Sequence, residues 1–363
     1  MPTDPVYRSG PERTQSAPTS VPATQDRPPA GPGMQSGRLP EEPQGPLTVG
    51  VGPYRLALRR LLRNKIALAF AVLFALLVIV CLLAPVYSHD VAHIGPNTTN
   101  VTGTITVNGH VEDVVSASGV PIGPTGTRHY LFGADEEGRD LAVRLLYGGR
   151  TSLLIGAVAT SIIIIFGTLM GLLAGYNRFA DAVLRPIMQL IWSFPPVILG
   201  VAVGTALALG GIGPVKGNSV FIPAFIIGVI YIPYLGFPVR GEVLRLRELD
   251  FVDAARVQGM SPWRIMLSEI LPNTASTIIV FVPMMLAYSI LLEAYLSFLG
   301  AGVQPPNASW GTLISDGIDY IQTVPTFALI PGAMLVLTVL SINVLGDGVR
   351  DALDPRAQVR IKT

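Results

Sequence analysis

Apolar residues gather in six long runs along this 363-residue chain, and polar stretches separate them. Each run is long enough to cross the hydrocarbon core of a bilayer as a helix, allowing for tilt. A segment inside lipid must satisfy its own backbone hydrogen bonds, and a helix does so. The pattern therefore predicts an all-α integral membrane protein with six transmembrane helices, at about residues 66–86, 151–176, 186–209, 219–239, 274–299 and 324–346.

The second run carries a small-residue face. Gly167, Gly171 and Gly175 recur every fourth residue, so a helix places them on one side. Small residues at this spacing allow two helix backbones to approach closely in a membrane. We expect another helix to pack tightly along this face.

Basic residues in short flanking loops predict the orientation of the bundle. They gather in residues 55–65, 178–185, 240–264 and 350–362, which fall on one side if both termini are cytoplasmic. The arginines of residues 139–150 disagree, but they share their stretch with four acidic residues. We therefore expect both termini to be cytoplasmic.

The first 48 residues differ in kind from the rest. Eleven of the first fifty residues are proline, and no apolar periodicity accompanies them. Such a segment buries too little apolar surface to offset its ordering entropy, so we expect a disordered cytoplasmic tail. No apolar core follows a short basic start, so it does not read as a signal peptide. Partner binding is possible, but we favour an inert tail.

The remaining chain divides into four parts. Residues 49–86 hold a basic interfacial helix and the first span, residues 87–150 an extracytoplasmic loop, and residues 151–349 five helices with a loop at about 241–273. A cytoplasmic tail completes the chain at 350–363.

The extracytoplasmic loop predicts two local elements. Residues 104–111 alternate in character around Asn108-Gly109, which favours a hairpin with a two-residue turn. Contact with a substrate-binding protein and a passive insert are both compatible with this small β-prone element. Leu141 to Arg150 read as a short interfacial helix. The irregularly spaced His89, His93 and His110 favour solvated side chains over a metal site.

A polar, arginine-bearing segment between the fourth and fifth runs reads as two short helices meeting at a sharp turn. Asp250 is the expected N-cap, with Asp253 in capping-box position. Gly259 can take the left-handed conformation that closes a helix, and Ser261-Pro262 then begins the next one. Ala254 and Ala255 leave a thin helix surface that could enter a partner's groove. On local grounds an ordinary loop is the alternative to a docking element.

This segment resembles the coupling loop of bacterial ABC-importer permeases, in which Glu-Ala-Ala precedes Gly and then Ile-x-Leu-Pro. Here Asp253, Ala254, Ala255, Gly259, Leu271 and Pro272 match it; Asp253 replaces Glu, and Glu269 replaces Ile. Further stretches resemble the dipeptide and oligopeptide branch of these permeases (the DppC/OppC type): residues 129–156, 293–306, 309–311 and 343–356. The resemblance covers the chain from about residue 50 to its end, apart from the extended external loop.

The resemblance implies a multi-pass protein of a bacterial-type inner membrane that takes up di- or oligopeptides. It implies a second permease chain, one or two kinds of ABC ATPase subunit, and an extracytoplasmic peptide-binding protein as partners. ATP and magnesium would bind those ATPase subunits, with no cofactor on this chain. Related permeases serve nickel, haem or glutathione, so these substrates remain alternatives.

Ionisable residues near the outer ends of the runs are candidate pathway or rim groups. Glu293 lies inside the fifth run, where an ionisable residue is a functional candidate by default. It could face the pathway, or pair with Arg139 or Arg150 at the outer rim, and we favour the pair. Asp140 lies beside these arginines. For Asn343, in the sixth run, we favour a helix–helix hydrogen bond over substrate contact.

Several functional classes are disfavoured by what the sequence lacks. It contains no G-x-x-x-x-G-K-[ST] phosphate loop, so ATP hydrolysis is expected on other subunits and an enzyme is disfavoured. It contains no metal-ligand spacing, and Cys81 is its single cysteine. A net charge of +1 gives no electrostatic case for nucleic acid. An ion-coupled carrier and a membrane scaffold remain the competing hypotheses.

Overall fold

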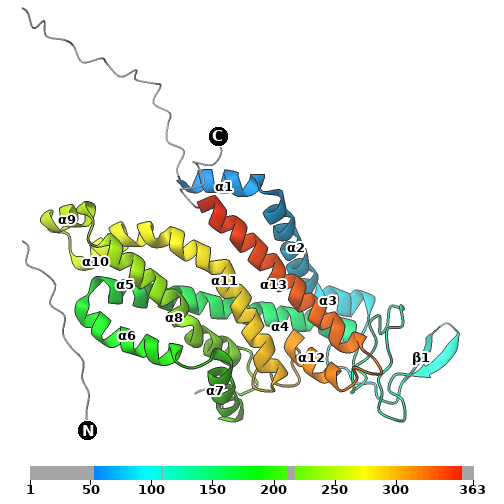
Figure 1. The fold of residues 1–363 in the computed structure, drawn as a ribbon. Helices are drawn as coiled ribbons and strands as arrows, with labels where there is room; N and C mark the ends of the chain where they lie inside the picture. Colours follow the sequence, from blue (N-terminus) through cyan, green and yellow to red (C-terminus); the bar gives the residue numbers. More distant parts are fainter. Residues whose placement is uncertain (1–52, 108, 211–216, 354–363) are drawn as a thin grey trace, which may run out of the picture. The chain divides into compact units, whose positions relative to one another are not determined.

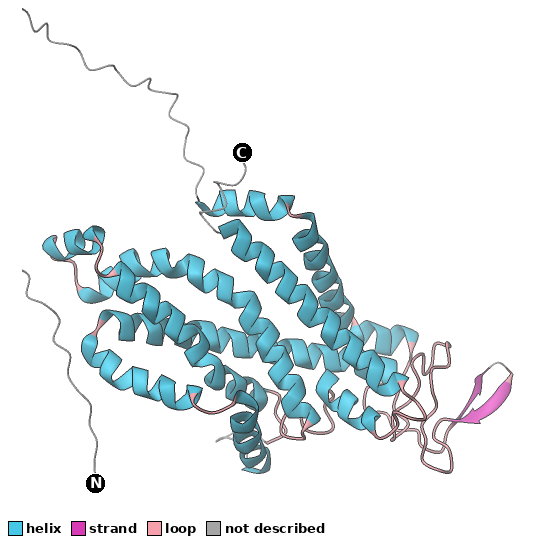
Figure 2. Ribbon diagram, viewed as in Figure 1, coloured by secondary structure: helices cyan, strands magenta, loops and turns pink. Residues whose placement is uncertain are grey.

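The computed structural model describes residues 53–107, 109–210 and 217–353. The predicted proline-rich tail (1–48) lies outside these residues, as does the C-terminal tail beyond residue 353. The described part, within the compact unit of residues 51–363, is mostly helical, with one small sheet (Figure 2).

Five helical stretches of the described residues are long and apolar enough to cross a membrane, and a bent pair of helices makes a sixth when counted as one span. Three of them are single helices: α2 (Lys65–Leu82), α8 (Phe221–Leu246) and α13 (Thr326–Leu353). The stretch Leu141–Tyr176 consists of α4 (Leu141–Ile162), η2 (Ile163–Gly167) and α5 (Thr168–Tyr176). The stretch Pro262–Phe298 consists of α10 (Pro262–Arg264), η3 (Ile265–Ile270) and α11 (Leu271–Phe298). The elements η2 and η3 are π-helical turns within these stretches. The prediction of an all-α membrane bundle is confirmed.

The third predicted span is not a single helix. Instead α6 (Arg178–Trp192) and α7 (Pro196–Gly210) meet at an angle of 91° across a break of a few residues. Pro195 lies in the break and Pro196 begins α7. Proline disfavours a helical conformation in the residue before it, and it removes an N–H donor, so the pair ends α6 here. The prediction of one helix over residues 186–209 is wrong.

The short interfacial helix predicted from Leu141 to Arg150 is also wrong, because these residues form the first turns of α4. Leu141 and Leu145 are buried against Trp310 and Leu313 of α12 (Trp310–Ile318), in one apolar cluster. The apolar run of the second span begins only at about residue 151, but its helix already begins at Leu141. The first turns of the helix are buried because they pack against α12.

The glycine face of the second span packs against α8, as predicted. A Cβ atom added at Gly171 would lie 2.7 Å from the Val239 side chain, and one at Gly175 would lie 2.6 Å from the Val243 side chain. Real Cβ atoms do not approach so closely, so any larger residue would push the helices apart. The α5 and α8 backbones are therefore in close contact because these positions are glycine.

The N-terminal elements pack against α13. The helix α1 (Pro53–Arg63) precedes α2, whose N-cap Asn64 accepts a hydrogen bond from the backbone N–H of Ala67. At Gly348 of α13, an added Cβ would lie 2.4 Å from the Ala67 Cβ. This close approach fixes the first span on the sixth (Figure 1).

The segment from Ala84 to Asp140 forms loops with a hairpin at one end of the bundle. It begins with α3 (Ala84–Val86) and η1 (Tyr87–Val91). The predicted hairpin is confirmed: β1 (Thr104–Val107) pairs antiparallel with β2 (His110–Asp113), and Val107 lies opposite His110. Gly109 has the positive φ of +85° that the tight turn requires. The hairpin and the turn between α9 (Asp250–Val257) and α10 lie at opposite ends of the helical bundle (Figure 1).

Candidate coupling and outer-face sites

The turn between α9 and α10 is closed by a glycine, as the sequence predicts. Gly259 has φ +77°. Its N–H donates to the Arg256 carbonyl at 2.9 Å, and the Met260 N–H donates to the Ala255 carbonyl at 3.1 Å. These are the two bonds of a Schellman motif, in which a left-handed residue satisfies the last carbonyls of a helix. Ser261 then precedes Pro262, which occupies the first position of α10.

The start of α9 differs from the prediction. The N-cap is Leu249, which makes no side-chain capping bond, so Asp250 is the first helical residue and no capping box forms. Asp253 instead pairs with Arg256 one turn later, at 2.7 Å. Both aspartates still lie in the first turn, where the helix dipole favours negative charge.

The two alanines of the predicted docking surface face in different directions. Ala254 is exposed, whereas Ala255 is buried and belongs to the same core cluster as Val252 and Ile265. Only Ala254 therefore contributes to the outer face, and the expectation that both alanines form it is wrong. The exposed face also carries large apolar side chains, with Val257 89% exposed and Trp263 53% exposed.

The residues that follow the turn, at the end of the predicted loop, differ in exposure. Leu271 is half-buried and Pro272 is exposed at the start of α11. Glu269 accepts a hydrogen bond from the Ser268 hydroxyl at 3.1 Å. Glu269 therefore makes a polar contact just before α11 begins.

Two arginines, Arg240 within α8 and Arg247 at its C-cap, connect the helices at this end of the bundle. Arg240 donates to both carboxylate oxygens of Asp181 in α6, each at 2.6 Å. Arg247 donates to the carbonyl of Gly175, near the end of α5, at 2.9 Å. Bidentate arginine–carboxylate pairs are the stronger and more directional ion pairs. These bonds join α8 to α6 and to α5.

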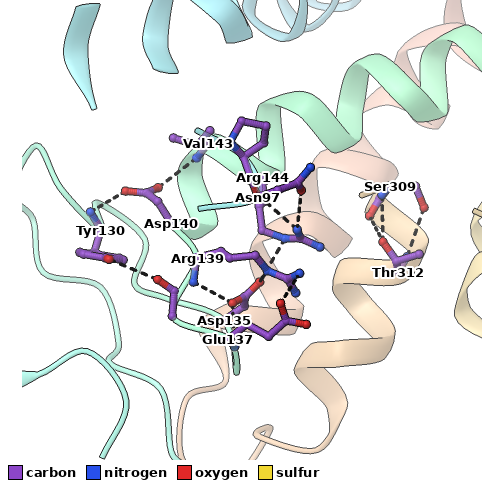
Figure 3. Close-up of polar contacts among 12 residues, drawn as sticks. Asn97, Tyr130, Asp135, Glu137, Arg139, Asp140, Val143, Arg144, Ser309 and Thr312 are labelled. Carbon is purple, nitrogen blue, oxygen red and sulfur yellow. Dashed lines mark hydrogen bonds and ion pairs between the residues drawn. The ribbon is translucent and has the colours of Figure 1, made fainter. Parts of the chain in front are cut away.

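At the opposite end of the bundle, the Asp135 carboxylate is surrounded by donors (Figure 3). It is fully buried and accepts hydrogen bonds from the backbone N–H groups of Glu137 and Arg139. The Arg139 Nε lies 2.6 Å from its Oδ2, and the Arg144 Nε lies 3.1 Å from the same oxygen. Burying charges is costly unless they are paired and bonded, and this arrangement meets that condition.

Asp140 ties the loop to the first turn of α4. One carboxylate oxygen accepts from the Val143 N–H at 3.0 Å as the helix N-cap, and the other accepts from the Tyr130 N–H at 2.7 Å. Burial raises the pKa of the Asp140 carboxyl, while these two bonds act to lower it. Arg144 extends the connection by donating to the carbonyl of Pro96 at 3.3 Å. Asp140 and Arg144 therefore attach two parts of the loop, at Tyr130 and at Pro96, to the N-terminal end of α4.

The expected rim pair of Glu293 is wrong. Glu293 is fully buried in α11 and accepts from the Ser297 hydroxyl at 2.7 Å. Arg139 pairs instead with Asp135 and Glu137, and Arg150 lies over the Tyr147 ring. A buried serine one turn away therefore replaces the distant arginine as its partner.

Trp310 of α12 is fully buried and joins α12 to α4. Its backbone N–H donates to Ser152 at 3.2 Å and its indole N–H donates to the Leu145 carbonyl at 3.2 Å. Ser309 and Thr312 close the start of α12 with a capping box (Figure 3). This helix packs against the N-terminal half of α4 and the C-terminal half of α11.

The sequence did not mark Asp135, Arg144 or Tyr130 as site residues. Asp135 and Arg144 stand in a stretch of mixed charge, which predicts solvated side chains more readily than a buried network. The sequence did contain one indication of the network, which is the high density of charged residues directly before the second apolar run. If the helix of that run begins among these residues, their charges must pair with one another.

These features define a multi-spanning membrane protein with an exposed, glycine-closed turn at one end and a buried polar network at the other. Residues 151–359 match the family model of the binding-protein-dependent transport system inner membrane component. The chain belongs to this family. Residues 52–102 match a second model, the N-terminal transmembrane domain of oligopeptide transport permease C.

Individual relatives agree with the family. The chain is 34% identical to the dipeptide transport system permease protein DppC of Alkalihalophilus pseudofirmus over 84% of this chain and 91% of that protein. It is 34% identical to the oligopeptide transport system permease protein OppC of Haemophilus influenzae, over 83% and 88%. It is 38% identical to the glutathione transport system permease protein GsiD of Pectobacterium atrosepticum, over 64% and 74%.

Among solved structures, inward-facing conformations of the MetNI methionine ABC transporter are similar at 21% identity and a TM-score of 0.45, over 58% of this chain and 96% of that chain. Membership of the family makes the chain a multi-pass inner-membrane transport subunit rather than an enzyme.

Proposed function

We propose that this chain is a permease subunit of an ATP-driven importer of di- or oligopeptides, and that it forms half of a pore with a second, different permease chain. Relatives named for dipeptide and oligopeptide transport, each similar over more than four fifths of this chain, support peptides as the substrate. A relative named for glutathione transport supports glutathione, itself a small peptide, as the second candidate.

The observation that carries the proposal is the exposed turn between α9 and α10. Its outer face presents Asp253, Ala254 and Val257. A short helix with apolar and charged side chains can lie in a groove of a partner. We assign this face to an ATPase subunit, on the cytoplasmic side of the membrane, with both termini on that side.

The mechanism follows from how the turn is attached. Val252 and Ala255 are buried in the main core, and Arg240 and Arg247 join α8 to α6 and α5. A displacement of α9 by the ATPase subunits would therefore move α5, α6 and α8 with it. The bundle would switch between outward- and inward-facing states, and the coupling between ATP binding and pore opening would be reciprocal.

The remaining partners belong to the same proposal. One or two kinds of ATPase subunit would hold ATP and magnesium, and this chain would hold no cofactor. An extracytoplasmic peptide-binding protein would deliver substrate at the end of the bundle where the hairpin lies.

Uptake into proteoliposomes tests the proposal. The complete complex, with its binding protein, should accumulate labelled peptide only when ATP is present on the ATPase side. A protonophore should leave this uptake unchanged while ATP remains high. Uptake that needs an ion gradient and no ATP would instead establish an ion-coupled carrier.

A further inference from the structure

A cavity of about 620 Å³ lies between α11 and α13. Its lining comes from the N-terminal half of α11 and the C-terminal half of α13, and it combines apolar, hydroxyl, amide and charged side chains. Ligand pockets fall in this range of volume, and they commonly pair an apolar wall with a few polar groups. The cavity is therefore large enough for a small solute.

Close approach of the two helices forms one boundary of the cavity. A Cβ added at Gly346 of α13 would lie 2.9 Å from the Cβ of Pro283 in α11. Because Gly346 has no side chain, the helices meet at this point, and Asn343 and Asp347 line the cavity on either side of it in the sequence.

Two opposite charges line this cavity without pairing. Asp347 and Arg350 lie one turn apart on α13, and neither makes an ion pair or a hydrogen bond within the part of the chain that the structure describes. An aspartate and an arginine at this spacing normally attract each other. In α9 the same spacing gives the ion pair of Asp253 with Arg256, at 2.7 Å. The two cavity charges are therefore available to a ligand.

Asn343 is available as well. The helix–helix hydrogen bond predicted for it is wrong, because its side chain is exposed and lines the cavity with no hydrogen-bond partner among the described residues. An amide can donate to a carboxylate or accept from an ammonium group.

Aromatic side chains lead from the cavity to the bend between α6 and α7. Tyr288 lines the cavity and is 38% exposed, and its ring lies 6.2 Å from that of Tyr231. The ring centroids of Tyr231 and Tyr234 are 4.9 Å apart, and those of Tyr234 and Trp192 are 4.2 Å apart. Aromatic faces attract both apolar groups and cations. This row therefore suits peptide side chains and ammonium groups.

We propose that the cavity is a subsite for the free ends of a short peptide during transport, an inference that rests on the proposed function. Asp347 binds the peptide's ammonium group, Arg350 binds its carboxylate, and Asn343 donates to or accepts from either end. Tyr288 packs against the peptide's side chains. A zwitterion carries one charge of each sign, and the cavity offers one unpaired partner for each. In the proposed topology this subsite lies at the cytoplasmic end of the pore, on the exit side.

Cysteine labelling tests whether a peptide occupies the cavity. Cys81, the single native cysteine, is fully buried, so a maleimide reports mainly on an introduced residue. Asn343→Cys places a thiol in the cavity, and Asp351→Cys places one on the same helix, exposed but outside the lining. In the complete complex turning over ATP, a saturating alanine dipeptide should reduce labelling of Asn343→Cys and leave Asp351→Cys unchanged. Equal labelling with and without the dipeptide overturns the inference.

The same experiment separates a peptide from a lipid. A zwitterionic phospholipid headgroup also carries an ammonium and an anionic group, so it could shield the cavity. A bound lipid would make labelling of Asn343→Cys slow without peptide, and peptide would not change the rate. Faster labelling after removal of lipid would then identify the lipid and overturn the peptide subsite.

Charge variants test the roles of the two residues. A hydrogen bond to a charged group contributes enough that Asp347→Asn or Arg350→Gln should each slow peptide uptake about tenfold at saturating binding protein. Asp351→Asn is the matched control and should transport normally. The exchange of Asp347→Arg with Arg350→Asp should not restore uptake, because each charge then lies where the other belongs. Recovery of uptake in the exchanged variant would show that the two residues act only by pairing with each other, and it would overturn their roles in binding peptide.

The outcomes distinguish this inference from the proposed function. A wild-type complex that takes up none of a panel of alanine peptides, two to five residues long, overturns both. A wild-type complex that takes up peptide while the charge variants match it overturns the subsite alone.

Discussion

Replacing Gly259 tests whether the turn between α9 and α10 needs its left-handed backbone. Gly259 has φ +77°, and a Cβ built there meets nothing within 4 Å. A loss in Gly259→Ala, which adds only a Cβ, therefore comes from the backbone and not from a clash. An L-residue in this conformation costs about 1–2 kcal/mol, and a β-branched residue is a marked outlier there.

The size of the effect follows from this cost. A penalty of about 1.4 kcal/mol shifts the population of the intact turn about tenfold. We expect transport to fall in the order Gly259→Asn, Gly259→Ala, Gly259→Val, because asparagine tolerates the left-handed region best. ATP hydrolysis should lose its dependence on peptide in the same order, as the coupling surface loses its shape.

Gly241 in α8 provides the matched control. A Cβ there also meets nothing within 4 Å, but Gly241 is helical and has no positive φ. Gly241→Ala should therefore leave uptake unchanged and stabilise the helix by about 0.5–1 kcal/mol. The assay is peptide uptake by purified complexes with equal subunit content. Normal uptake by a fully assembled Gly259→Val complex would refute the reasoning.

Three further predictions concern stability, read as the thermal unfolding of the purified complex. Arg240→Gln removes both hydrogen bonds to Asp181 and should cost about 1–2 kcal/mol, while adding Asp181→Asn should cost little more; full additivity would contradict the pairing. Asp140→Ala removes the N-cap of α4 and the acceptor of the Tyr130 N–H, and should cost about 2 kcal/mol; an unchanged midpoint would exclude this role. Burial raises the pKa of Asp316 from 3.8 to about 6, so the folded protein holds this proton more tightly than the unfolded chain. The contribution of Asp316 to stability is therefore greatest below about pH 4 and is lost as pH rises through 6. Asp316→Asn should remove this part of the pH dependence of stability. Parallel pH profiles for variant and wild type would contradict this prediction.

The helical bundle could be predicted from the sequence because the bilayer imposes a simple requirement of length and apolarity. Local chemistry also predicted the turn at Gly259, the start of α10 at Pro262 and the hairpin that turns at Gly109, since each depends on residues adjacent in the chain. The packing face of Gly171 and Gly175 followed from periodicity alone.

The wrong predictions have different physical causes. The continuation of α4 through Leu141 depends on Trp310, which lies 169 positions later (310 − 141). Glu293 accepts a hydrogen bond from Ser297 on its own helix, whereas the predicted partners Arg139 and Arg150 make other contacts. Pro195 and Pro196 marked the break after α6, but the sequence did not give its 91° angle.

The central claim is that this chain transmits the work of separate ATPase subunits through the α9–α10 turn. Its most direct test is purification of the tagged chain in mild detergent, with co-purifying subunits identified and ATPase activity measured, for the wild type and for Asp253→Arg. The charge reversal replaces an exposed carboxylate on the proposed docking face, so it should leave the fold intact. The account predicts that wild type recovers a second permease and ATPase subunits, and that Asp253→Arg loses them or uncouples their activity. A chain that purifies alone and transports without ATP would contradict it.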